Sequence, residues 1–249
     1  MVAVVTGAGN GIGEAIVQSF VREGAFVAVA DIDVQAAGNV ADRLRALHAG
    51  ADAQAVAVDV TNPASVTAMV EFAIERWGRI DVLVNSAGGF SRLAPITEVS
   101  DDDWSRVIAV NFTSVFLCSR AVIAPMKAQG GGRIINIASQ AGVTPNPYAA
   151  SFVPYGAAKA GVIGFTRLLA REVGVHGITV NAISPGTTAT DRVKKARGED
   201  SLRQIAAQNP LGVLAEPEDS AEAAVYLASA AARRVTGINL NVNAGSVML

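Results

Sequence analysis

Short runs rich in Val, Ile and Ala alternate along this chain with longer segments of helical period. This alternation constrains the fold more than any other feature. The strand candidates are residues 2–6, 26–30, 54–58, 80–84, 133–138, 179–183 and 239–242. Most are continuous apolar runs, which suit strands buried on both faces of a parallel sheet. The pattern predicts a Rossmann-like, doubly wound α/β fold with about seven parallel strands and helices on both faces.

The chain offers no obvious point of division. Its 249 residues contain no linker, internal repeat or low-complexity stretch, and a domain of this size can bury a large core. Apolar residues make up 51% of the chain and charged residues 17%, a balance that argues against disorder. We therefore expect residues 1–249 to form a single domain.

The weakest regular pattern lies in residues 187–214, where charged side chains crowd together. They are Asp191, Arg192, Lys194, Lys195, Arg197, Glu199, Asp200 and Arg203. Two interpretations stay open. The segment is a mobile lid over a substrate site, since lids pack lightly and must open, or it is an amphipathic surface helix with a solvated face.

Charge and cysteine content exclude several classes of partner. The formal net charge is −2, and no Lys/Arg cluster is dense enough to predict binding to nucleic acid or a membrane surface. The N-terminus shows no secretory signal, and no apolar run approaches the roughly 18 residues that span a bilayer. The sole cysteine, Cys118, cannot form an internal disulfide, which fits a reducing compartment. We expect a cytoplasmic protein.

A glycine-rich turn follows the first strand and leads directly into a helix. Glycines there let the backbone approach a pyrophosphate, which the helix N-terminus stabilises through its free N–H groups and dipole. The spacing is G-x-x-x-G-x-G rather than the common G-x-G-x-x-G, and any tight turn favours glycine. The position of the turn between strand and helix nevertheless predicts a dinucleotide site. Its residues are Gly7, Asn10, Gly11, Ile12 and Gly13.

The second strand ends at Asp31. A carboxylate there can accept hydrogen bonds from both adenosine ribose hydroxyls, and it would repel a 2′-phosphate. No Arg or Lys lies in the glycine turn or just after Asp31 to neutralise such a phosphate. The alternative is a simple helix N-cap, for which Asp is well suited. Taken with the glycine turn, Asp31 favours NAD over NADP.

Further motifs follow in a characteristic order. They are Asp59-Val60 after the third strand, Asn85-Ser86-Ala87-Gly88 after the fourth, Asn111, Ser139, Tyr155-x-x-x-Lys159, and Pro185-Gly186 followed by Thr187 and Thr190. Together with the glycine turn, this set resembles the short-chain dehydrogenases/reductases, and the match covers nearly the whole chain. There are two departures. The family usually has a second Asn at Ser86, and Asn243-Ala244-Gly245 replaces a more usual Asp-Gly-Gly.

The resemblance implies roles for these residues around the cofactor. Asp59 and Val60 would hold the adenine edge, and Asn85, Ala87 and Gly88 would border the adenosine side. Thr187 and Thr190, which follow Pro185 and Gly186, would meet the nicotinamide carboxamide. By the same resemblance Lys159 would grip the nicotinamide ribose, and Asn111 would complete a proton path through water.

The chemistry of the catalytic group can be argued from the residues themselves. Tyr155 and Lys159 are four residues apart, so on a helix they project from one face. A free tyrosine has a pKa of about 10, and a nearby ammonium would lower it so that the phenolate can take a proton from an alcohol. Ser139 would hydrogen-bond the reacting oxygen. The expected activity is NAD(H)-dependent interconversion of a secondary alcohol and a ketone, with Tyr155 as general acid/base.

Three other functions stay open. An NADPH-dependent ketone reductase is the nearest alternative. A catalytically silent NAD-sensing module would be expected to lack Tyr155, Lys159 or Ser139, and a methyltransferase would not require them. No metal is expected, because His48 and His176 are far apart and no Cys/His cluster has zinc spacing.

The substrate pocket is expected from residues 89–96, 140–154 and 187–214. The first two segments carry Phe90, Leu93, Pro145, Tyr148 and Phe152, which suggest a neutral, partly hydrophobic substrate. Ser139 and Tyr155 are sixteen positions apart, a few more than the family usually shows. We interpret the extra residues as a loop bulging toward the substrate, with Tyr148 on it and outside the proton-transfer machinery, since no cation follows Tyr148 by four residues.

Two helical segments, residues 102–129 and 154–175, resemble those that pack between subunits in the family. Both carry apolar residues on more than one side, and a helix that is apolar beyond one stripe needs a second surface to bury against. The candidate residues are Val107, Val110, Val115, Leu117, Val162, Phe165, Leu168 and Leu169. We expect a homotetramer, or failing that a dimer.

Overall fold

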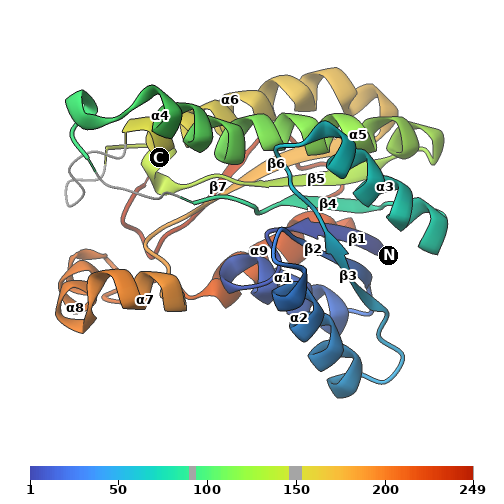
Figure 1. Ribbon diagram of the computed structural model, residues 1–249, viewed down its shortest axis with the longest axis horizontal. Helices are drawn as coiled ribbons and strands as arrows, with labels where there is room; N and C mark the ends of the chain where they lie inside the picture. Colours follow the sequence, from blue (N-terminus) through green and yellow to red (C-terminus); the bar gives the residue numbers. More distant parts are fainter. Residues whose placement is uncertain (90–93, 146–152, 249) are drawn as a thin grey trace.

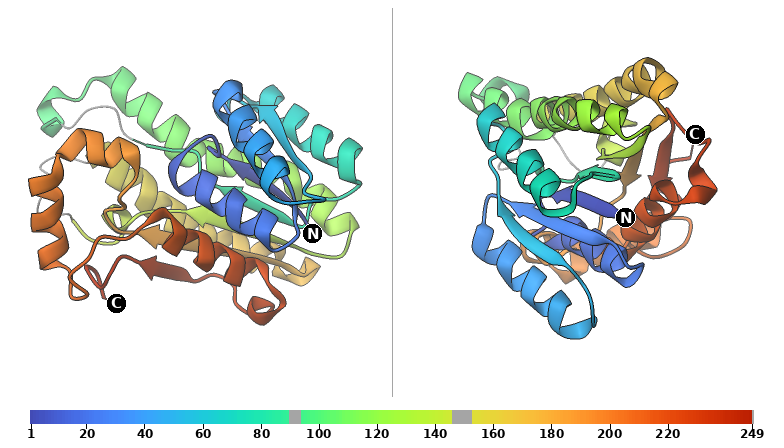
Figure 2. Two further views of the ribbon diagram at one scale, coloured as in Figure 1. Left: turned by 90° about the horizontal axis from the view of Figure 1, so that it is seen from below. Right: turned by 90° about the vertical axis from the view of Figure 1, so that its right-hand side faces the viewer.

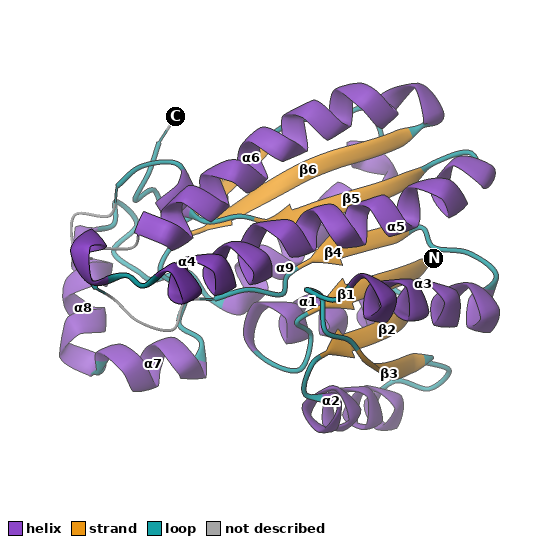
Figure 3. Ribbon diagram, turned by 45° about the horizontal axis from the view of Figure 1, so that its top comes forward, coloured by secondary structure: helices purple, strands orange, loops and turns teal. Residues whose placement is uncertain are grey.

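A parallel sheet of seven strands forms the centre of the computed structural model, which describes residues 1–89, 94–145 and 153–248. The strand order is β3-β2-β1-β4-β5-β6-β7, and each neighbouring pair of strands is parallel (Figure 3). The strands are β1 (Val2–Thr6), β2 (Phe26–Asp31), β3 (Ala53–Ala57), β4 (Val82–Asn85), β5 (Gly132–Ile137), β6 (Ile178–Pro185) and β7 (Asn239–Val242). The predicted doubly wound α/β fold is confirmed.

Helices cover both faces of this sheet (Figures 1 and 2). One face carries α1 (Gly11–Arg22), α2 (Val34–Leu47) and α9 (Pro217–Ala228), whose apolar residues share one core with the sheet. The other face carries α3 (Pro63–Trp77), α5 (Ser114–Ala128) and α6 (Val153–Val173), which share a second core.

The two cores explain why the strands read as continuous apolar runs. Successive side chains of a strand point to opposite faces. In β1, Ala3 and Val5 enter the first core and Val4 enters the second. In β4, Val84 enters the first core and Leu83 the second. Since both faces are covered, both sets of positions are mostly apolar.

The strand order reverses next to β1, which lies between β2 and β4. The chain leaves β1 toward one side of the sheet and, after β3, crosses back to β4 on the other side. At such a switch point the connections diverge above the carboxyl ends of the strands and leave a crevice between them, which is where ligands bind in sheets of this type. The architecture therefore places the candidate site at the carboxyl ends of β1 and β4.

Helix ends follow from local sequence. Asn62 caps α3 by accepting the amides of Ala64 and Ser65, and Pro63 stands in the first turn, where its missing N–H costs no helical hydrogen bond. For α2 the cap is Asp33, whose carboxylate accepts the amides of Gln35 and Ala36. The capping role considered for Asp31 is therefore wrong, and its carboxylate serves another purpose.

The helix above β4 and β5 runs continuously over Asp101–Ala128 and changes its winding midway. It comprises α4 (Asp101–Ile108), a π-helical segment (Ala109–Thr113) and α5. Single π turns often mark functional sites, because they disturb the regular hydrogen-bond ladder. Here the π segment contains Asn111.

By length and composition this 28-residue helix could cross a membrane, with a mean hydropathy of 1.8 over its most apolar window. From the sequence we expected no apolar run long enough to span a bilayer, because only uninterrupted runs of apolar residues were considered. Polar residues such as Ser114 and Ser119 interrupt this run. The core helix of a folded protein passes the same test. About 39% of the window is buried, and Leu117, Val122 and Met126 of α5 lie in the second core.

The charged segment forms two short helices beside the carboxyl ends of the strands (Figure 1). These are α7 (Asp191–Arg197) and α8 (Glu199–Gln208), joined at Gly198, whose φ is +71°. No residue of α7 is buried, and Leu202 is the one buried residue of α8. A single bridge between Thr188 and Ala215 ties the base of the segment together. This light packing is what a lid requires.

Candidate active site

A cleft of about 980 Å³ lies at the carboxyl edge of the sheet, between the strand ends and α7. Its lining includes sixteen of the residues predicted from the sequence. They are Gly7, Asn10, Gly11, Ile12, Gly13, Asp31, Asp59, Val60, Ala87, Gly88, Tyr155, Lys159, Pro185, Gly186, Thr187 and Thr190. Ser139 also lines the cleft, whereas Asn85 and Asn111 lie behind its surface.

The glycine turn after β1 is built by close backbone approaches. A β-carbon on Gly7, whose φ is +63°, would lie 2.6 Å from Cα of Ala87, and one on Gly13 would collide with the carbonyl oxygen of Gly7. Gly11, with a φ of +58°, borders Thr190 across the cleft. The turn therefore brings bare backbone and the N-terminal amides of α1 to the cleft, a cradle that fits the pyrophosphate of a dinucleotide.

Asp31 holds this turn in place from the end of β2. Its Oδ2 accepts the amide of Gly9 at 2.8 Å, and its Oδ1 accepts the amide of Asp33 at 3.0 Å. The carboxylate is thus oriented by two backbone donors while it lines the cleft. The following residue, Ile32, is 75% exposed and offers no cation. This environment fits a pair of ribose hydroxyls.

Asp59 and Val60 lie beyond Asp31 along the same edge. Oδ1 of Asp59 accepts the amide of Thr61 at 2.9 Å and its hydroxyl at 2.6 Å, which closes a tight turn after β3. Val60 is nearly buried and presents an apolar wall. An apolar surface with a fixed carboxylate at its rim can hold the edge of an adenine.

The structure does not place Asn85 at the surface of the cleft. Its side chain turns into the protein, where its amide nitrogen donates to Oδ1 of Asn136 at 2.8 Å and to the hydroxyl of Ser119 at 3.2 Å. Asn85 thus ties β4 to β5 and α5. The neighbouring Ser86, which departs from the family pattern, does line the cleft. Its amide donates to the hydroxyl of Thr6 at 3.2 Å.

Ser139 and Tyr155 meet at the other end of the cleft. A hydrogen bond joins their side chains, so the predicted closeness of these residues is confirmed despite their separation in the sequence. The loop after Ser139 is pressed onto α6, because a β-carbon on Gly142 would lie 2.5 Å from the carbonyl carbon of Lys159. Tyr148 and the aromatic residues Phe90 and Phe152 lie outside the described residues, as does Leu93.

Lys159 lies beneath Tyr155 on the same helix. Its Nζ is 5.7 Å from the centre of the phenol ring and donates to the carbonyl of Ile137 at 2.7 Å. The side chain is almost completely buried, and this burial lowers the pKa of Lys159 to about 8. The cation is thus directed partly at the end of β5 rather than wholly at the phenol.

The pKa of Tyr155 is raised, because burial disfavours the phenolate. Two groups oppose this effect. The hydrogen bond with Ser139 lowers the pKa, and so does the positive charge of Arg192 on α7. The sequence predicts that Lys159 supplies the lowering charge, and its Nζ lies 5.7 Å from the centre of the ring. Arg192 of the charged segment is a second cation acting on the phenol, to which the sequence reasoning gave no role.

Asn111 approaches the same region from the π turn. Its Oδ1 accepts the amide of Gly89 at 2.9 Å, and its Nδ2 donates to the carbonyls of Gly89 at 2.8 Å and Val107 at 2.9 Å. A β-carbon on Gly88 would lie 2.8 Å from Oδ1 of Asn111 and 3.3 Å from Nζ of Lys159. Asn111 and Lys159 therefore converge on one backbone position, and Gly88 leaves the room for it.

Several residues of the cleft were given no individual role by the sequence reasoning. Eight of them fall within the segments expected to form the substrate pocket, namely Gly89, Gln140, Ala141, Ala189, Arg192, Lys194, Lys195 and Arg197, whereas Val110, Glu216 and Glu218 lie outside those segments and were missed. For Arg192 the available signal was the crowding of charge just after Thr190. Charge alone does not tell which side chain turns toward a site and which faces solvent.

Two other kinds of reactive group give no second site. Within residues 1–89, 94–145 and 153–248, no three His, Cys, Asp or Glu side chains are grouped to hold a metal ion. Cys118 is buried, and burial raises the pKa of its thiol to about 12, so it stays protonated at neutral pH.

Comparisons with known proteins agree with this geometry. A family model described as enoyl-(acyl carrier protein) reductase matches residues 7–246. The chain is 40% identical over 248 residues to a 3-oxoacyl-(acyl-carrier-protein) reductase, FabG, of Salmonella typhimurium, covering all of this chain and 98% of that protein. It is 41% identical over 251 residues to a D-threitol dehydrogenase of Mycolicibacterium smegmatis, covering 98% and 92%.

Two solved structures share the architecture over nearly the full length. A short-chain type dehydrogenase/reductase from Mycobacterium marinum superposes with a TM-score of 0.93 at 32% identity, covering 100% of this chain and 96% of that one. A structure from Brucella melitensis 16M described as ribose-5-phosphate isomerase superposes with a TM-score of 0.90 at 40% identity, covering 98% and 91%.

Proposed function

The chain belongs to the short-chain dehydrogenase/reductase family, whose members bind a nicotinamide dinucleotide, and we propose that it is an NAD(H)-dependent oxidoreductase interconverting a secondary alcohol and a ketone. One observation carries the proposal. Tyr155, hydrogen-bonded to Ser139 and stacked above Lys159, lies in the same cleft as the glycine turn and Asp31. A proton-transfer group and a dinucleotide cradle thus share one cavity.

In this proposal Tyr155 moves the proton at the substrate oxygen. The bound cofactor supplies or accepts the hydride. Because burial keeps the phenol protonated, Tyr155 is suited to donate its proton to the developing alkoxide during ketone reduction. Ser139 donates a hydrogen bond to the same oxygen and holds it beside the phenol. In the direction of oxidation Tyr155 must first lose its proton, so that direction is favoured at higher pH.

Lys159 and Asn111 would return a proton to the hydroxyl of Tyr155 after each reduction. Both converge on Gly88, and each is anchored to backbone, Lys159 through Ile137 and Asn111 through Gly89. Groups fixed in this way can pass a proton through water to the buried end of the cleft without moving themselves. Lys159 would also bind the nicotinamide ribose, and Thr187 and Thr190 the carboxamide.

NAD is the proposed cofactor because of Asp31. Its carboxylate is held by the amides of Gly9 and Asp33 and cannot turn away from the cleft without breaking both bonds. A 2′-phosphate would meet this fixed negative charge, with the uncharged Ile32 beside it. The alternative, an NADPH-dependent ketone reductase, would need a cation at this end of the cleft.

The substrate cannot be inferred from the names of the relatives, because these describe different substrates. One is described as acting on a 3-oxoacyl group, one on D-threitol and one on ribose 5-phosphate. The experiment is a screen of secondary alcohols with NAD⁺ and of ketones with NADH, followed at the nicotinamide absorbance, with NADP(H) in parallel. Turnover that depends on Tyr155 supports the proposal. Tight NADH binding without turnover of any compound would instead favour the silent NAD-sensing module.

A homotetramer in the cytoplasm completes the proposal. Val115, Leu117 and Val162 are buried inside the protomer and need no partner, but Leu168 on α6 is 75% exposed and Phe116 on α5 is 41% exposed. These exposed apolar side chains favour subunit contacts. A monomer by light scattering at micromolar concentration would contradict the assembly. The sole cysteine, buried and unpaired, fits the reducing cytoplasm.

A further inference from the structure

Arg192 is the first cation of α7, and its guanidinium reaches across the cleft to the loop after β4. A β-carbon on Gly89 would lie 2.5 Å from Nη1 of Arg192 and 3.3 Å from its Cζ. Gly89, with a φ of +147°, thus leaves room for the guanidinium against its backbone. The same charge acts on the phenol of Tyr155. Arg192 therefore lies at the reactive end of the cleft.

Charged groups of both signs line the cleft. All four cations of α7 line it, namely Arg192, Lys194, Lys195 and Arg197. Its carboxylates are those of Glu14, Asp31, Asp59, Asp191, Glu216 and Glu218. Lys159 adds a buried cation below Tyr155. Of these cations, the contacts place Arg192 and Lys159 beside Tyr155.

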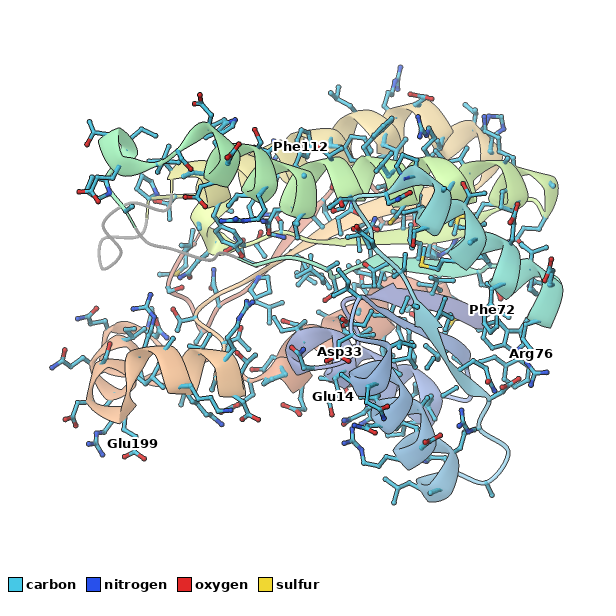
Figure 4. The ribbon with its side chains drawn as sticks, in the orientation of Figure 1. Glu14, Asp33, Phe72, Arg76, Phe112 and Glu199 are labelled. Carbon is cyan, nitrogen blue, oxygen red and sulfur yellow. The ribbon has the colours of Figure 1, made fainter. Side chains whose placement is uncertain are left out.

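Not every charged residue of the charged segment, residues 187–214, points into the cleft. Glu199 lies at the outer end of α8 and is directed away from the sheet (Figure 4). Arg203 of α8 pairs with Asp200 on the exposed side of the same helix and is absent from the cleft lining. The inward position of Arg192 is therefore a specific feature of α7.

We propose that Arg192 binds an oxyanion carried by the substrate, a carboxylate or a phosphate only a few bonds from the reacting carbon. The inference rests on the proposed alcohol–ketone chemistry and names its substrate class. A guanidinium offers a planar fork of donors that matches such a group with two parallel hydrogen bonds. The neutral substrate suggested by Phe90, Leu93, Tyr148 and Phe152 is thereby revised to a small hydroxy or keto compound with one anionic group.

The test compares matched pairs of ketones that differ only in the anionic group, with NADH as reductant. One pair is 3-oxobutanoate and its methyl ester, and the other is dihydroxyacetone phosphate and dihydroxyacetone. We expect the enzyme to prefer the anionic member of one pair by about tenfold or more in kcat/KM, the contribution of a charge-assisted hydrogen bond. The preferred pair then identifies carboxylate or phosphate as the source.

The variant Arg192→Met should lose that preference by raising KM for the anionic ketone, while its Kd for NADH stays within about twofold. Arg192→Lys keeps the positive charge but loses the two parallel donors of the guanidinium, so it should retain part of the preference for the anionic ketone. The matched control is Arg203→Met, which removes the same charge from α8 and should change neither quantity. Arg192 lowers the pKa of Tyr155. In Arg192→Met the rate of alcohol oxidation should therefore begin to increase only at a higher pH than in the unaltered enzyme.

Two results would overturn the inference while leaving the proposed function intact. One is equal turnover of both members of each pair, unaffected by Arg192→Met. The other is a loss of NADH affinity in Arg192→Met that accounts for the whole effect, which would assign the guanidinium to the cofactor. Absence of nicotinamide turnover with every alcohol and ketone would instead remove the proposed function itself.

Discussion

The two ends of the cleft are built by different means. The end at which we propose that the adenosine binds, called the adenosine end below, is shaped mainly by backbone at the ends of β1, β2 and β3, through Gly7, Gly13 and the amides bonded to Asp31. The reactive end consists of side chains that arrive from α6, the π turn, the loop after β5 and α7. A surface made of backbone tolerates few changes in shape. A surface made of side chains from separate elements can change its chemistry without changing the fold.

The largest effect is expected at the reactive end. Tyr155→Phe removes the proton-transfer hydroxyl and keeps the ring, so turnover should fall by about 10³-fold. NADH affinity should stay nearly unchanged, because the adenosine end is untouched. Stopped-flow turnover and fluorescence titration measure the two quantities. The control is Tyr226→Phe on α9, an exposed tyrosine outside the cleft. Retention of most activity by Tyr155→Phe would remove the distinction between the two ends.

The pH dependence of the same residue has a definite sign. Burial raises the pKa of Tyr155, so the phenol carries its proton at neutral pH. Reduction, which uses this proton, should stay steady up to pH 10 and decline only above it, whereas oxidation, which needs the phenolate, should increase over the whole range. Initial rates in both directions over pH 6–10 test this point. An oxidation rate that falls over that range would contradict the general acid/base role.

Lys159→Met should separate stability from activity at the reactive end. A buried ammonium is costly, so replacing it with an apolar side chain of similar length should stabilise the cofactor-free protein by roughly 2 kcal/mol at pH 7. Turnover should be lost. Because the pKa of Lys159 in the folded protein, about 8, lies below the ordinary value, the penalty is full below pH 8 and shrinks as pH rises toward 10.

Urea unfolding of both proteins at pH 7 and pH 10 measures this change. The control is Lys127→Met near the end of α5, where the side chain is exposed and little change is expected. A destabilised Lys159→Met protein would show that the bond to the Ile137 carbonyl outweighs the desolvation of the ammonium.

At the adenosine end the expected effect is on cofactor choice. NAD(H) should be preferred over NADP(H) by about tenfold or more in kcat/KM, or about 1.4 kcal/mol. Asp31→Ala combined with Ile32→Arg removes the carboxylate and adds a cation at an exposed position, so the preference should shift toward NADP(H). Steady-state kinetics with both cofactors decide this. Equal efficiency of the unaltered enzyme with the two would refute the role of Asp31.

The smallest effect concerns the base of the charged segment. Ala244 has a φ of 52°, the left-handed region that glycine adopts more easily, and its carbonyl accepts the amide of Leu211 at 3.3 Å. Ala244→Gly should therefore stabilise the protein by roughly 0.5 kcal/mol. Ala207→Gly in α8 should instead lower the free energy of unfolding, because glycine weakens a helix. Thermal unfolding of both variants tests the pair. A less stable Ala244→Gly protein would show that the backbone is not strained there.

The sheet, its helical layers and the glycine turn at the end of the first strand could be predicted from the sequence alone. Continuous apolar runs require burial on both faces of the sheet. A glycine-rich turn between a strand and a helix indicates a dinucleotide site, so both features can be predicted from local chemistry. The pairing of Tyr155 with Lys159 was equally readable, because helical spacing places both on one face.

The meeting points of side chains from distant segments could not be predicted in this way, because they depend on how the helices and strands pack. Asn85 turned away from the cleft to bond Asn136, a choice that depends on the neighbouring strand. Arg192 turned toward Tyr155, although its helix carries three other cations. The direction of a long, charged side chain depends on the elements packed around it, and that packing has no periodic signature along the chain.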